Sequence, residues 1–96
     1  MDSARAHITV SGMFHGMFFR SDIRTKARNL SLKGWIKKSQ GGNFEIVAEG
    51  DRQAIETLVN YIKNGEFTRV IISMDVKWAD FAGEFKGFEI ISEDFA

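Results

Sequence analysis

Apolar and polar residues alternate along four stretches of the chain, as expected for strands that have one face on a core. These stretches are residues 7–12, 33–38, 44–49 and 70–78. In the last of them the alternating apolar residues are Val70, Ile72, Met74, Val76 and Trp78. A shorter strand is predicted at residues 88–91. The pattern therefore predicts five strands.

Two other stretches carry apolar residues at helical spacing. The first helix is expected to open at Ser21 or Asp22, and its apolar stripe consists of Ile23, Ala27 and Leu30. Gly50-Asp51 caps the second helix, and Asn64-Gly65 ends it. The apolar positions of the second helix are Ile55, Leu58, Val59 and Ile62. Each helix therefore has one apolar face that can cover a sheet.

The order of these elements indicates the fold. Residues 40–43 predict a hairpin turn between the second and third strands. The resulting order is β-α-β-β-α-β, followed by one extra strand. Two such split βαβ units form an α+β ferredoxin-like sandwich, in which both helices pack on one face of an antiparallel sheet. We expect one domain over residues 1–96, with a short extra C-terminal strand.

Length and composition limit the kinds of function. A chain of 96 residues supports one core, which buries roughly 60–65% of the unfolded surface. There is no cysteine, which excludes disulfides, thiolate nucleophiles and cysteine metal sites. No apolar stretch approaches the ~20 residues of a membrane span, and residues 1–5 lack the layout of a signal peptide. We therefore expect a cytoplasmic protein that does not associate with membranes.

The charges are unevenly distributed, although the formal net charge is zero. Residues 20–38 contain seven cations and one acid, whereas residues 39–96 contain five cations and eleven acids. An anionic partner near the basic segment would explain this asymmetry. A helix with a solvated basic face also explains it, and charge alone favours that second interpretation.

Several common catalytic motifs are absent from the sequence. It contains no P-loop, dinucleotide-binding or serine-hydrolase motif. The two histidines, His7 and His15, have no carboxylate at metal-ligand spacing. The carboxylates of the second half form no recognisable catalytic pair and are expected to be solvated surface groups. We therefore expect no metal site and no cofactor.

The segment between the first strand and the first helix carries the candidate chemistry. In this segment, residues 12–20, we expect Gly12 and Gly16 to bracket a short loop and Arg20 to lie where the helix begins. Backbone N–H groups at a helix start lack partners inside the helix, and the helix dipole adds partial positive charge there. An arginine at that position can bond two phosphate oxygens at once. The arrangement suits an oxyanion, but a glycine loop before a helix is common and does not identify a site by itself.

Four motifs in the chain resemble those of the acylphosphatase family. The segment from Val10 to Arg20 is similar to the family signature, a glycine followed by Q-G-V-x-F-R. Gly34-Trp35-Ile36 is similar to the family's G-W-V. Residues 45–50 resemble V-E-V-x-A-E-G, and residues 85–90 resemble F-x-G-F-x-I. Together the motifs cover about residues 7–91 in the family's order.

This resemblance implies a reaction and a set of site residues. Acylphosphatases hydrolyse carboxylic–phosphoric anhydrides to a carboxylate and phosphate, without a metal or an organic cofactor. By motif match, Arg20 takes the role of the catalytic, phosphate-binding arginine. The implied phosphate-binding residues are His15, Gly16, Met17, Phe18, Phe19 and Arg20. The implied partner is a small-molecule acyl phosphate or inorganic phosphate, with no nucleic acid, and we expect a monomer.

One departure from the family pattern concerns the group that positions water. The family reads G-W-V-x-N, whereas residues 34–38 read G-W-I-K-K, so Lys38 stands at the asparagine position. A carboxamide offers an acceptor and donors to a water, but an ammonium offers donors only. We therefore expect Lys38 to be a catalytic-site residue that weakens or alters turnover, or that adds to phosphate affinity.

Three interpretations remain open. The first is an acylphosphatase-family hydrolase with weak or altered activity. The second is a non-catalytic phosphate- or anion-binding module of the same fold. The third is an RNA-recognition module, because such modules share the βαββαβ order and Lys86-Gly87-Phe88 resembles part of their signature. The loop that ends at Arg20 favours the first two, and Lys38 discriminates between them.

Overall fold

A computed structural model of the chain describes residues 2–12 and 16–91. Its elements are β1 (Ser3–Gly12), α1 (Met17–Asn29), β2 (Lys33–Lys38), the 3₁₀ turn η1 (Gln40–Gly42), β3 (Asn43–Asp51), α2 (Arg52–Asn64), β4 (Ile71–Ala79) and β5 (Phe88–Ile91). The order β-α-β-β-α-β with a short extra strand confirms the prediction. The connection between β2 and β3 is a hairpin, as expected.

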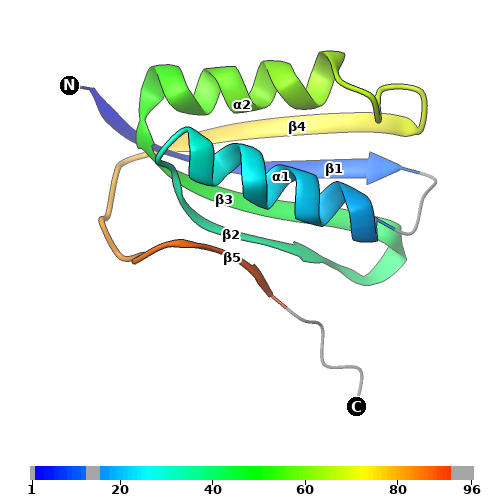
Figure 1. Ribbon diagram of the computed structural model, residues 1–96, viewed down its shortest axis with the longest axis horizontal. Helices are drawn as coiled ribbons and strands as arrows, with labels where there is room; N and C mark the ends of the chain where they lie inside the picture. Colours follow the sequence, from blue (N-terminus) through cyan, green and yellow to red (C-terminus); the bar gives the residue numbers. More distant parts are fainter. Residues whose placement is uncertain (1, 13–15, 92–96) are drawn as a thin grey trace.

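The five strands form one sheet in the order β4-β1-β3-β2-β5, and both helices lie on the same face of it (Figure 1). The first four strands pair antiparallel, but β5 pairs with β2 in parallel, so the complete sheet is mixed rather than antiparallel. The chain path explains this difference. β4 finishes at the end of the sheet where β2 begins, and the segment after β4 crosses that end to reach the free edge of β2 (Figure 1).

The core lies between the helices and the inner face of the sheet. β1 begins at Ser3 rather than at residue 7, because Ala4 and Ala6 continue the buried row of Ile8 and Val10. The predicted apolar positions of α2 are buried as expected: Ile55, Leu58, Val59 and Ile62. In the described part of the chain, no helix is long and apolar enough to cross a membrane.

The first helix begins at Met17 rather than at Ser21 or Asp22. Gly16 adopts a left-handed conformation with φ of 85°, and the Arg20 N–H donates to the Gly16 carbonyl oxygen at 2.8 Å. Phe19 is therefore a helical residue, and it extends the buried stripe of α1 by one turn. The segment 16–20 therefore forms the first turn of a helix, whereas a loop was predicted there.

The alternation predicted for β4 is wrong at Ile72. Ile72 is 67% exposed, whereas Ile71 packs against the core. The cause is an irregularity in the pairing with β1, where Ser11 pairs with Ser73 but Gly12 pairs with Ile71. The extra residue reverses the faces of the residues before it.

A hydrogen bond joins the two helices. The Tyr61 hydroxyl on α2 donates to Asp22 Oδ2 on α1 at 2.7 Å. This bond raises the pKa of Tyr61 to about 12, with burial and the negative charges of Asp22 and Glu66 adding to the effect. The folded state therefore favours the protonated hydroxyl.

We expect the tyrosinate absorbance of the native protein to appear near pH 12, whereas the tyrosine of an unfolded chain titrates at pH ~10. Because the folded pKa is the higher one, the stabilisation from this bond is fully present below pH ~10. It is lost as the pH rises towards 12. The chain has one tyrosine, so the absorbance reports on Tyr61 alone. Tyr61→Phe should remove this alkaline loss of stability, and a native midpoint near that of the unfolded chain would contradict the assignment.

Candidate functional site

The first turn of α1 is a positively polarised helix end. Gly16 is the N-cap residue and, as a glycine, has no side chain that could cap the N–H groups that follow. Those groups have no acceptor within the helix, and the dipole adds partial positive charge. The turn contains no acidic residue that would oppose a bound anion. This end of α1 therefore suits a phosphoryl group.

Arg20 adds a full positive charge at the same place. Its Nε donates to the Gly16 carbonyl oxygen at 3.2 Å, which holds the partly buried guanidinium against the first turn. Within residues 2–12 and 16–91, no carboxylate pairs with Arg20, so its charge is not neutralised there. The terminal nitrogens of a guanidinium can donate to two oxygens of one phosphate.

The ring of Phe44 packs directly against Gly16. Phe44 lies in β3 and is fully buried. A Cβ atom built on Gly16 would lie 2.0 Å from Phe44 Cζ, so a side chain at this position does not fit. The ring of Phe19 lies 5.2 Å away, centre to centre, and its plane is tilted. Phe44 therefore fixes the height of the first turn of α1 above the sheet.

Lys38 lies over the same ring. It is the last residue of β2, and it pairs directly with Phe44 in β3. Its Nζ lies 5.9 Å from the centre of the Phe44 ring, a position where the ring quadrupole attracts a cation. One aromatic ring thus lies next to both the start of α1 and the amine of Lys38.

Two of the predicted site residues, Gly16 and Arg20, are in direct contact. A third, Lys38, lies over the Phe44 ring that packs against Gly16. Phe44, which holds them in place, was not predicted as a site residue. The alternation in β3 places Phe44 in the core, but its contact with Gly16 joins distant parts of the chain and has no signal in the sequence.

The other predicted residues contribute in different ways. The ring of Phe19 is buried in the core, so only its backbone can face a ligand, whereas Met17 and Phe18 are 65% and 84% exposed. His15 lies outside the described residues. Among the residues that are described, no three His, Asp or Glu side chains are placed to hold a metal ion.

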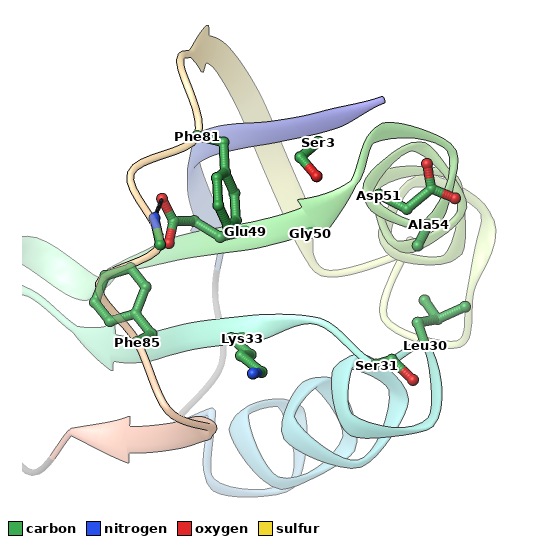
Figure 2. Close-up of a pocket in the computed structure, with 11 residues that line it drawn as sticks. Ser3, Leu30, Ser31, Lys33, Glu49, Gly50, Asp51, Ala54, Phe81 and Phe85 are labelled. Carbon is green, nitrogen blue, oxygen red and sulfur yellow. Dashed lines mark hydrogen bonds between the residues drawn. The ribbon is translucent and has the colours of Figure 1, made fainter. Parts of the chain in front are cut away.

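A separate pocket of about 440 Å³ lies at the opposite end of the sheet. Figure 2 shows that its wall includes Phe81 and Phe85, from the segment between β4 and β5, and Lys33, which begins β2. Lys38 ends the same strand, so the pocket is distinct from the site at the start of α1.

Glu49 beside this pocket is a buried carboxylate with a structural role. It is 2% exposed, and its Oε2 accepts the N–H groups of Ala82 at 2.7 Å and Gly83 at 3.3 Å. Its Oε1 accepts the N–H of Glu84 at 3.3 Å, and Arg5 Nη1 lies 3.6 Å from Oε2. The expectation that the carboxylates of the second half are solvated is wrong for Glu49, which anchors the segment before β5.

Replacing Gly16 by alanine should destabilise the protein more than the same change at Gly41. The two glycines have nearly equal φ values, 85° and 84°, so alanine costs about 1–2 kcal/mol in backbone conformation at either position. A methyl at Gly41 meets nothing within 4 Å, but at Gly16 it meets the Phe44 ring. Overpacking should therefore add about 1–3 kcal/mol at Gly16 alone. Urea unfolding measures both variants, and equal losses would show that the Phe44 contact is not tight.

Known proteins match this chain along most of its length. The acylphosphatase family profile matches residues 6–90. The acylphosphatase of Pelotomaculum thermopropionicum is 42% identical over 90 residues, which cover 94% of this chain and 98% of that protein. The acylphosphatase of Roseiflexus sp. (strain RS-1) is 37% identical over 91 residues, which cover 95% of this chain and 98% of that protein.

The fold agrees with the sequence match. The crystal structure of acylphosphatase from Bacillus subtilis superposes with a TM-score of 0.83 at 28% identity. The superposition covers 92% of this chain and 98% of that one. The resemblance drawn from the four motifs is thereby confirmed, and this chain belongs to the acylphosphatase family.

Proposed function

We propose that this protein hydrolyses acyl phosphates to a carboxylate and inorganic phosphate. The observation that supports the proposal is the Phe44 ring, which packs against Gly16 at the start of α1 and has the Lys38 amine 5.9 Å from its centre. Arg20 bonds to the same Gly16. The relatives, which are named acylphosphatase, support the same reaction. Membership of that family favours a hydrolase over a non-catalytic anion-binding module.

The RNA-recognition alternative has a specific observation against it. Such modules stack bases on exposed aromatic side chains of their sheet. Phe88, the aromatic residue of the segment that resembles their signature, is buried in the core beneath the helices. It therefore offers no surface for a base.

Binding in this proposal uses the first turn of α1 and Arg20. The phosphoryl oxygens accept hydrogen bonds from the N–H groups of the turn and from the guanidinium. A carboxylate is a good leaving group, so the anhydride needs no general acid. Catalysis then rests on holding the phosphoryl group and stabilising its charge while water attacks. No metal and no organic cofactor enter this scheme.

Lys38 limits the rate in this proposal. A protonated amine donates to a water but accepts nothing from it, so it orients the attacking water poorly. Its charge attracts the phosphoryl group in the bound substrate as well as in the transition state. Such uniform attraction tightens binding without speeding the chemical step. We therefore propose a protein that binds phosphate well and turns over slowly.

We further propose that the protein is a monomer, works in the cytoplasm and binds no nucleic acid. Gly16, Arg20 and Lys38 come from one chain, so the site needs no second copy. The absence of cysteine suits a reducing compartment, where disulfides are rare.

Arg20→Ala should weaken the binding of inorganic phosphate and remove turnover together. Loss of hydrogen bonds from a charged group lowers the affinity by about 10- to 100-fold. A titration followed by amide NMR shifts measures this, and the shifts of the parent should centre on residues 16–20. Arg24→Ala, one helical turn further along α1, is the control for net charge. The site is wrong if both variants lose the same affinity, or if Arg20→Ala hydrolyses acyl phosphates as well as the parent.

Lys38→Asn should raise kcat for the hydrolysis of benzoyl phosphate. The gain should approach about 100-fold, the scale of restoring a misplaced reacting group. The affinity for phosphate should stay similar or fall slightly, because a nearby positive charge is lost. The matched control is Lys37→Asn, since Lys37 lies over Trp35 instead of Phe44.

Two other outcomes of the Lys38→Asn test would indicate a different role for Lys38 or for the whole protein. A fast parent that is slowed by asparagine would show that Lys38 has its own catalytic role. Absence of turnover in both proteins, with phosphate still bound, would instead support the anion-binding module.

A further inference from the structure

The amine of Lys38 is a nucleophile beside the proposed phosphoryl site. Successive side chains of a strand point to opposite faces, and the neighbouring Lys37 accordingly lies over Trp35, with its Nζ 5.3 Å from the ring centre. The next residue, Ser39, donates its hydroxyl to the Asn43 carbonyl oxygen at 3.3 Å. Lys38 is therefore the nucleophilic side chain of β2 that shares the Phe44 ring with the start of α1.

An acyl phosphate held at the start of α1 brings an electrophile to this amine. Its carbonyl carbon is separated from phosphorus by a single bridging oxygen, so fixing the phosphoryl group also confines the carbonyl. The four methylenes of lysine let the amine reach over the ring on which it rests. Holding a nucleophile and an electrophile in one site raises their effective concentration far above that in solution.

We propose that the acyl phosphate bound by this protein acylates Lys38. The neutral Nζ attacks the carbonyl carbon and forms a C–N bond, and the C–O bond to the phosphate breaks. The electron pair of that bond leaves with the phosphate, which takes up, through water, the proton that the nitrogen loses. The products are an N-acyl-lysine and inorganic phosphate. The inference rests on the proposed function, because it requires an acyl phosphate bound at Arg20.

Acylation changes the hydrogen bonding available at position 38. The ammonium carries a positive charge and only donates, whereas the product ends in a neutral secondary amide with one donor and one acceptor. An amide is the group that the family's asparagine carries at this position. The acylated side chain therefore differs from the original in both charge and water-binding capacity.

The test incubates the full chain with an excess of acetyl phosphate and follows intact mass and peptide mass with time. We expect one acetyl group to appear first on Lys38, at least ~10-fold faster than on Lys37, because only Lys38 shares the site. Inorganic phosphate at saturating concentration should remove this preference. Phosphate competition uses the unmodified protein, so its outcome does not depend on the folding of a variant.

Variants provide matched controls. Lys38→Arg keeps the charge but removes the amine that takes the acetyl group, so the rapid acetylation should disappear. Lys37→Arg should leave the rapid acetylation of Lys38 unchanged. Arg20→Ala should lower the acetylation rate of Lys38 to that of Lys37. The inference is overturned if Lys38 reacts no faster than Lys37. It is also overturned if the preference survives both excess phosphate and Arg20→Ala, since the reaction would then not use the site.

The same samples separate this inference from the proposed function. Phosphate release in molar excess over the protein measures hydrolysis, whereas the label on Lys38 cannot exceed one group per chain. If the protein binds phosphate and turns over acetyl phosphate, but Lys38 is not acetylated faster than Lys37, only the acylation proposal is overturned. Absence of phosphate binding at residues 16–20 overturns the proposed function itself.

Discussion

The packing of the Phe44 ring against the bare Cα of Gly16 determines the geometry on which the rest of the site depends. Because Gly16 has no side chain, the buried ring reaches the backbone where α1 begins. The same ring packs on Phe19 and lies under Lys38. A single side chain on a central strand therefore packs against the helix start and lies under the amine. A site that is held by packed, regular elements keeps its groups in position better than a site on loops.

The opposite end of α1 depends on a polar interaction that is far from the site. Arg28 Nε donates to the Phe88 carbonyl oxygen at 3.0 Å, which ties the last turn of α1 to β5. The segment that leads into β5 is held by the three N–H bonds to Glu49. Each hydrogen bond to a charged group contributes about 1.5–3 kcal/mol, which offsets the cost of burying the carboxylate. Phe44 and Glu49 thus hold α1 from its two ends, one by direct packing and the other through β5.

The sequence predicts the elements and the family well, because both depend on local patterns. The residue pattern predicts each strand and both helices of the described part of the chain, and the first of the four motifs makes Arg20 the candidate arginine of the site. The predictions fail where tertiary contacts, and not local patterns, determine the ends of an element or the exposure of a side chain. The start of α1 depends on how Phe19 packs in the core, and the exposure of Ile72 depends on the pairing with β1. Glu49 looks like a surface carboxylate until the segment before β5 folds over it, and the contact of Phe44 with Gly16 is visible only in three dimensions.

Under the two proposals, lysine at position 38 places two nucleophiles, water and its own amine, in competition for one bound substrate. Water attacks the phosphoryl group and regenerates the free protein, so that reaction repeats. The amine attacks the neighbouring carbonyl carbon and is consumed, so its reaction occurs once per chain. A poorly oriented water slows the first reaction, which gives the second more time for each bound substrate. Over many binding events, chains accumulate in the acylated form, in which position 38 carries an amide and no charge. In this scheme, lysine at the end of β2 affects the rate of hydrolysis and also the chemical identity of the group that faces the substrate.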